Sequence, residues 1–173
     1  MTKTKTILGL SLAAVFAVSM LGSAYAVGHL NITDISVEKS GRNGVNQSVH
    51  IDVAATVPAP TGADYGWAVI TSNGFLVITT HPNIGDDSTA QPPLDEYHTH
   101  FLTAEVSGPN CGTSPHATFA TINEVGRLSI VDDMIWVKNV PRGLAGDLTG
   151  TGFSFMLSTS GGDLCINGVN TFP

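Results

Sequence analysis

Residues 66–81, GWAVITSNGFLVITTH, are the stretch of the sequence that decides the fold. Two runs rich in β-branched and aromatic residues, 66–71 and 74–81, flank the dipeptide Asn73-Gly74. This dipeptide readily adopts the positive φ angles of a tight turn between antiparallel strands. The pattern predicts a β-hairpin, and it is the strongest such signal in the chain.

Residues 47–57 show the clearest alternation outside this hairpin. Apolar residues occupy one face, while His50 and Asp52 lie on the other. The pattern predicts a half-buried strand. Because both His50 and Asp52 fall on its polar face, we interpret them as a solvated surface pair rather than as a catalytic one.

The remaining segments also have the composition of short strands separated by Gly and Pro turns, and no segment combines a 3.6-residue period with helix caps. Strands are predicted at 30–38, 47–57, 66–71, 74–81, 97–107, 117–122, 127–131, 134–140 and 153–158, with a last one around Cys165. The glycine-rich residues 141–152 are predicted to form a loop. About nine short strands predict an all-β fold, a single antiparallel β-sandwich or barrel.

The N-terminus has the features of a secretory signal peptide. Lys3 and Lys5 precede an apolar run at 7–21 that leads to the small-residue site Ala24-Tyr25-Ala26. The run, about 15 residues long, is shorter than the roughly 20 residues that a membrane span needs. We therefore expect a cleaved signal peptide at 1–26 and one β domain at 27–173. No membrane span is expected after cleavage, and the predicted location is secreted, periplasmic or cell-surface.

The charge balance narrows the range of partners. The chain has 7 basic and 14 acidic residues, which gives a formal net charge of −7. Nucleic acid is therefore excluded as a partner class, and an anionic membrane surface is disfavoured. Acidic loops attract cations instead.

Cys111 and Cys165 are the two cysteines of the chain. In an exported protein an even count predicts a disulfide. Closing a loop of this length stabilises a fold by about 4 kcal/mol on the chain-entropy model. A thiolate metal site is the alternative, because Cys111 and His116 share a loop. A blue-copper site would need a Met shortly after the Cys, and the next one is Met134.

His98 and His100 are the main candidate metal ligands. They are two residues apart in a predicted strand, so both side chains leave the same face, which continues with apolar residues. His81 ends the preceding strand and arrives at the same end if the two strands are neighbours. Three imidazoles suit zinc or copper, and nearby carboxylates offer further ligands. Those carboxylates are Asp86, Asp87, Asp95 and Glu96. A hydrated rim of histidines and an acid-base role are the two alternatives.

His29 is a second candidate ligand that depends on the cleavage site. If the signal is cut after Ala26, the mature chain begins Val27-Gly28-His29. A free amine with His at position three can wrap Cu²⁺ or Ni²⁺ in a square-planar set of nitrogens. The alternative is a frayed tail that binds nothing.

The spacing of His98-Thr99-His100, Glu105 and Gly112 resembles the first motif of the cupin family. The resemblance implies a metal-binding β-barrel in which Glu105 joins the two histidines as a ligand. The leading glycine of the motif falls on Pro92, and no second motif is present. Glu105 has odd spacing from the histidines, so a bulge is needed for it to face them.

Three functions follow from these patterns. The first is a secreted or cell-surface β-sandwich binding module with a copper or zinc site on His98 and His100. The second is a structural or adhesive cell-envelope protein without a metal site, whose partner is an envelope protein or a glycan. The third is a cupin-like metalloenzyme; a non-enzymatic role is favoured. Sequons at Asn31 and Asn46 fit an exported protein.

Overall fold

The structure, a computed structural model, describes residues 28–60, 62–84 and 96–173. The predicted signal peptide and the candidate ligands Asp86, Asp87 and Asp95 lie outside the described residues. Within the described part, no helix has the length and hydropathy that a membrane crossing needs. The ten strands are β1 (Ile32–Ser40), β2 (Asn46–Val53), β3 (Tyr65–Thr71), β4 (Phe75–Thr80), β5 (His98–Glu105), β6 (His116–Ala120), β7 (Arg127–Val131), β8 (Met134–Pro141), β9 (Leu148–Ser160) and β10 (Asp163–Phe172).

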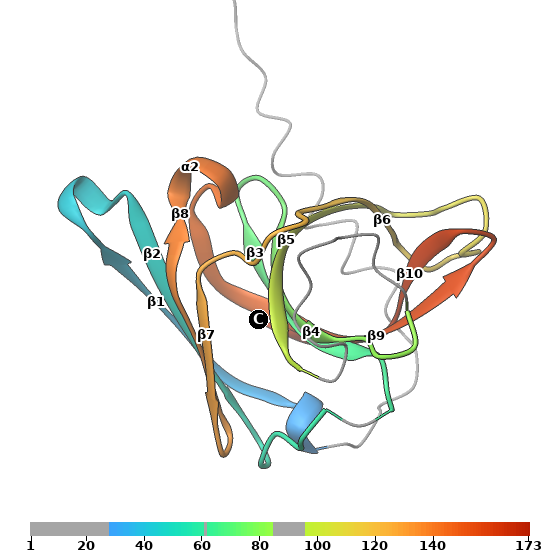
Figure 1. The fold of residues 1–173 in the computed structure, drawn as a ribbon, viewed down its shortest axis with the longest axis horizontal. Coiled ribbons are helices and arrows are strands. Elements are labelled where there is room, and N and C mark those ends of the chain that lie inside the picture. The colour runs from blue at the N-terminus through green and yellow to red at the C-terminus, as the bar shows by residue number, and fades with distance from the viewer. Residues whose placement is uncertain (1–27, 61, 85–95) are drawn as a thin grey trace, which may run out of the picture.

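The strands form a closed barrel and a second sheet beside it (Figure 1). The barrel has the strand order β10-β6-β5-β4-β3-β9, and the four-stranded sheet has the order β1-β2-β8-β7. All the pairings are antiparallel. The all-β antiparallel fold predicted from the sequence is therefore confirmed, with a barrel as its larger part.

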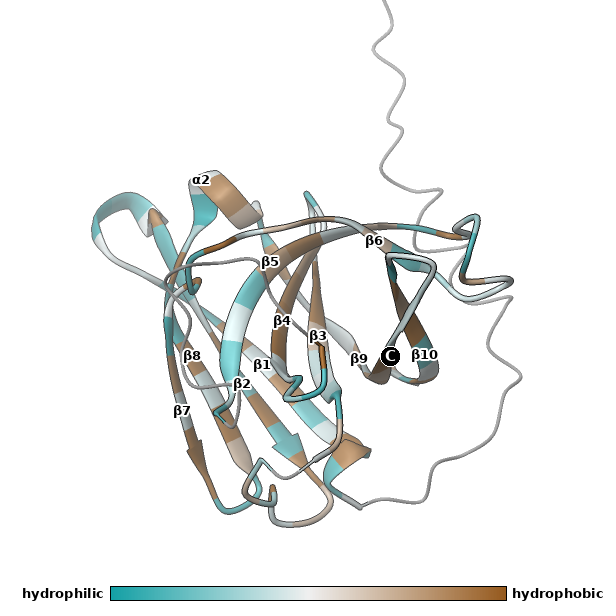
Figure 2. Cartoon of the chain, turned by 45° about the vertical axis from the view of Figure 1, so that its right-hand side comes forward, coloured by the Kyte–Doolittle hydropathy of each residue, from teal (hydrophilic) through white to brown (hydrophobic). Residues whose placement is uncertain are grey.

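The buried apolar residues form two hydrophobic cores. One lies between the sheet and the outer wall of the barrel and contains Leu76 and Ile78 of β4. The other fills part of the barrel interior and contains Phe75 and Val77 of the same strand. Because both faces of β4 are buried, it is a continuous apolar run rather than an alternating one. Figure 2 shows this run as a brown stretch along β4.

The β3–β4 hairpin is confirmed, but its predicted turn geometry is wrong. Neither Asn73 nor Gly74 has a positive φ angle. Instead, the Thr71 hydroxyl oxygen accepts hydrogen bonds from the backbone N–H groups of Asn73 (3.2 Å) and Gly74 (3.0 Å). A side-chain oxygen thus supports the turn. Gly74 is needed for another reason, since a Cβ there would lie 2.5 Å from the backbone oxygen of Leu102.

The loop predicted at 141–152 is also wrong in part. A single helical turn, α2 (Arg142–Ala145), is followed by the start of β9 at Leu148. The buried side chain of Gln47 holds this connection, because its amide donates to Gly146 O (2.6 Å) and accepts from Leu148 N (3.0 Å). Glycine at 152 permits close strand packing, since a Cβ there would lie 2.4 Å from the Ala68 oxygen. Among the described residues, the other helical segments are two short 3₁₀ turns, η1 (Gly28–Leu30) and η2 (Arg42–Gly44).

The predicted disulfide is present between Cys111 and Cys165, whose Cα atoms are 5.5 Å apart. It lies at the weakest seam of the barrel. The β6–β10 ladder contains a single residue pair, Cys165 with His116, supported by a hydrogen bond from Ile166 N to Pro115 O (2.8 Å). The disulfide therefore fastens β10 to the loop that precedes β6, next to the pairing that closes the barrel.

Candidate metal centre

Strand β5 directs two histidines into the barrel. Alternation along the strand places His98 and His100 on the same side as Leu102, a member of the interior core. Phe101 lies on the opposite side, in the core under the sheet, and the Thr99 hydroxyl donates to Val125 O (3.0 Å). The side predicted for the two histidines is therefore confirmed, and it is an interior face.

His81 joins them from the neighbouring strand. Strands β4 and β5 are paired, with Thr79 opposite His98, and His81 follows directly after β4. A turn begins at His81, whose carbonyl accepts from Ile84 N (3.1 Å). The side chain of Asn83 fastens this turn to the preceding loop by donating to Gly62 O (2.9 Å). The three imidazoles thus meet at one end of the barrel, as the neighbouring-strand hypothesis predicts.

The three rings form a compact and buried group. Their centroids are 4.5 Å apart for His81 and His98, 4.8 Å for His98 and His100, and 6.2 Å for His81 and His100. One ligand atom from each residue lies within 4.8 Å of the other two. Only 8%, 3% and 9% of the surfaces of His81, His98 and His100 are exposed. A solvated rim therefore does not describe these residues, and the group can hold a metal ion.

Backbone carbonyls set the orientation of all three rings. The Nδ1 atoms of His81, His98 and His100 lie 3.1, 3.1 and 2.7 Å from carbonyl oxygens. Those oxygens belong to Ile84, Glu96 and Thr121, respectively. Because a carbonyl oxygen only accepts, each Nδ1 must carry the proton and donate it. The lone pair of each neutral ring is then on Nε2, which is how protein scaffolds commonly prepare histidines for a metal.

The closest contact in the group joins the side chains of His81 and His98. The Nε2 atoms of His81 and His98 are 2.7 Å apart. With a proton on each Nδ1, two lone pairs face each other and repel, unless a proton or a metal ion lies between them. The separation itself suits a shared proton. Two nitrogens on one tetrahedral zinc ion lie about 3.3 Å apart, so metal binding would spread these rings by about half an ångström.

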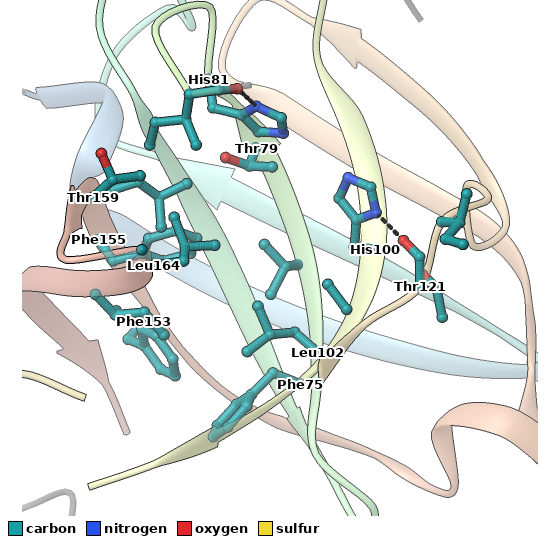
Figure 3. Close-up of a pocket in the computed structure, with 17 residues that line it drawn as sticks. Phe75, Thr79, His81, His100, Leu102, Thr121, Phe153, Phe155, Thr159 and Leu164 are labelled. Carbon is teal, nitrogen blue, oxygen red and sulfur yellow. Dashed lines mark hydrogen bonds between the residues drawn. The ribbon is translucent and has the colours of Figure 1, made fainter. Parts of the chain in front are cut away.

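The carbonyl that orients the His100 ring belongs to Thr121. Thr121 follows β6 and is held against β5 by two hydrogen bonds with Phe101. Its N–H donates to Phe101 O (3.0 Å), and its hydroxyl accepts from Phe101 N (3.0 Å). These bonds fix the position of the Thr121 carbonyl beside the His100 ring (Figure 3).

A pair of tyrosines anchors the start of β5. The Tyr97 hydroxyl donates to Pro58 O (3.0 Å) and is hydrogen-bonded to the Tyr65 hydroxyl. Burial raises the pKa of both phenols above the ordinary value of tyrosine, and in Tyr97 the hydrogen bond to Tyr65 adds to the shift. Both groups therefore stay protonated at neutral pH and hold the residue that precedes His98 in place.

The other candidate ligands do not join the group. Glu105, which the cupin resemblance implies as a ligand, is exposed at the opposite end of β5, where it pairs with His116. His29 lies on the outer side of the barrel against Tyr65, with 5.2 Å between ring centroids. Burial lowers the pKa of His29, which favours its neutral form. Its predicted role with the amine of Val27 lies outside the described residues and stays a prediction.

Glu96 contributes its backbone rather than its carboxylate to the group, through the bond from His98. Among the described residues, the cluster consists of the three histidines without a carboxylate or thiolate. The three histidines can be predicted from the sequence but the three carbonyls cannot, because every residue has a carbonyl and only the fold shows which ones approach a ring.

Comparisons of the chain with protein-family models, curated proteins and solved structures found no significant match.

Proposed function

We propose that the protein binds a transition metal, zinc or copper, through the Nε2 atoms of His81, His98 and His100. One observation carries the proposal: three buried rings lie together, and each has its Nδ1 at hydrogen-bond distance from a carbonyl oxygen, which leaves Nε2 as the atom for a metal. Imidazole nitrogen is a preferred ligand of both metals. Three histidines also leave a coordination position open, as in zinc sites that bind an exchangeable ligand.

The proposed setting is outside the cytoplasm. The disulfide between Cys111 and Cys165 is consistent with an oxidising compartment. The predicted signal peptide at 1–26 supports the same location. A secreted or cell-surface metal-binding module is therefore the function that the site supports best.

Metal analysis of the purified protein tests the proposal. Protein stripped with a chelator and reloaded with zinc is expected to retain about one ion per chain after dialysis. Loss of two of the three ligands in His98→Asn/His100→Asn should remove nearly all of it. Asparagine keeps a polar side chain at each position, and circular dichroism checks that the fold survives.

His50→Asn is the matched control, because it removes an imidazole from a strand outside the group. It should retain as much zinc as the unmodified protein. Equal metal content in His98→Asn/His100→Asn and in His50→Asn would overturn the proposal. The structural or adhesive interpretation of the protein would then be preferred.

A further inference from the structure

A cavity of about 310 Å³ lies inside the barrel next to the histidine group. Thr79, His81 and His100 line one part of it, and Phe75 and Phe153 line the other (Figure 3). The rest of its lining is mostly apolar and comes from β4, β5, β9 and β10, and from residues 120–122. The cavity therefore has a polar end and an apolar end.

A cavity of this size and lining is suited to a small ligand. Pockets that bind small molecules begin at about 300 Å³ and combine apolar walls with a few polar groups. An apolar space of about 150 Å³ accommodates benzene, with its six carbon atoms. By proportion, this cavity accommodates a molecule of about twelve non-hydrogen atoms.

The charge of the proposed metal centre determines which polar group the ligand should have. Three neutral imidazoles do not compensate the two positive charges of a divalent ion. An uncompensated charge in buried surroundings is unfavourable, so an anionic ligand at the open position is preferred. His81 and His100 both line the cavity, so a ligand inside it can reach that position.

We propose that the barrel binds a monocarboxylate with an apolar tail of about nine carbon atoms, whose carboxylate coordinates the metal. This inference rests on the proposed metal site. The tail lies against Phe75 and Phe153, while the carboxylate occupies the open position beside His81 and His100. The ligand class is a medium-chain fatty acid or a molecule of the same shape and charge.

Calorimetric titration with decanoate tests the inference, using zinc-loaded protein from which unbound zinc has been removed. Decanoate is expected to bind the zinc-loaded protein at least tenfold more tightly than the metal-free protein. Methyl decanoate has a similar tail but no charge, so zinc should not improve its binding. Equal affinity of decanoate for the two forms, or equal gains for acid and ester, would overturn the proposed coordination.

A substitution that fills the cavity tests binding of the apolar tail independently of metal binding. Ile166→Phe adds bulk from β10, which carries none of the three histidines, and should weaken decanoate at least tenfold while zinc affinity is unchanged. Leu157→Phe, at a half-buried lining position, serves the same purpose if the first variant does not fold. Leu128→Phe adds the same bulk next to the other core and is the control.

The two proposals fail in different ways. Protein that retains zinc but does not bind decanoate contradicts the carboxylate site and leaves the metal site standing. Protein that does not retain zinc contradicts both. If Ile166→Phe and Leu157→Phe fold and bind decanoate as tightly as Leu128→Phe, the ligand lies outside the barrel and the inference is wrong.

Discussion

Two pairs of polar residues have the same spacing in the sequence but lie in different surroundings in the structure. His50 and Asp52 on β2 are two residues apart, as are His98 and His100 on β5. The first pair forms a surface contact of 3.0 Å between Nε2 and Oδ1, with side chains 23% and 36% exposed. The second pair is buried inside the barrel and meets a third histidine.

The difference arises from what covers each strand. The outward face of β2 has a half-exposed neighbour, Trp136, whose ring centroid is 4.6 Å from that of His50. Strand β5 is covered on both faces, by the sheet on one side and by the barrel interior on the other. Spacing alone therefore identifies residues that share a face, whereas a metal centre also needs a neighbouring strand and oriented rings.

The largest expected effect comes from opening the barrel that encloses the buried pair. Cys111→Ser/Cys165→Ser should lower the free energy of unfolding by about 4 kcal/mol on the chain-entropy model. Because the β6–β10 seam has a single residue pair, amide hydrogen exchange should rise most in β6 and β10. The amides of β2 around His50 should stay protected, and a uniform rise over both sheets would contradict this assignment.

Zinc should distinguish the two pairs through stability. A ligand at one hundred times its dissociation constant stabilises the folded state by about 2.7 kcal/mol. Thermal unfolding with zinc should show this gain for the unmodified protein and for His50→Asn, but not for His98→Asn. A gain that survives in His98→Asn would mean that zinc stabilises the protein through another site.

A smaller effect is expected from the residue that orients His100. Thr121→Val removes the hydroxyl that accepts from Phe101 N, so the Thr121 carbonyl is held less firmly beside the ring. Loss of such support typically weakens metal binding about tenfold or more. Competition with a chromophoric chelator measures the change. Thr103→Val is the control, since Thr103 bonds to Thr118 at the exposed side of the same strand. Equal zinc affinity of the two variants would contradict an orienting role for Thr121.

The smallest effect is expected at the surface pair. A double-mutant cycle with His50→Ala and Asp52→Asn should give a coupling energy below about 1 kcal/mol, because single contacts between partly exposed polar side chains contribute little. Chemical denaturation at low and high salt measures this coupling. A larger value that is insensitive to salt would mean that the pair is more than a solvated contact.

Much of the fold could be predicted because the apolar pattern is strong. The hairpin at 66–81 and the side occupied by His98 and His100 follow from local residue types, whereas the disulfide follows from the two cysteines of a chain with a predicted signal peptide. The turn at Asn73 and Gly74 could not be predicted correctly, because Thr71 and the approach of Leu102 determine it. The start of β9 was missed, since its glycines suggest a loop until the packing against Ala68 is known.

The three histidines could be predicted from the order of the strands, but the contacts that bury and orient them could not. His81 was placed beside His98 only on the assumption that consecutive strands are neighbours, which the β4–β5 ladder bears out. The burial of the group depends on barrel closure, which involves β9 and β10, and these strands begin 48 and 63 residues after His100. No local pattern in the sequence contains that information.

The three histidines lie within twenty residues of chain, His81 directly after β4 and the other two on β5. Contacts between residues that are close in sequence form with little loss of chain entropy and therefore tend to form early in folding. The barrel closes much later along the chain, where Cys165 reaches Cys111. We therefore expect the proposed metal ion to be bound by a partly folded chain, before oxidation of the two thiols fastens the barrel around it.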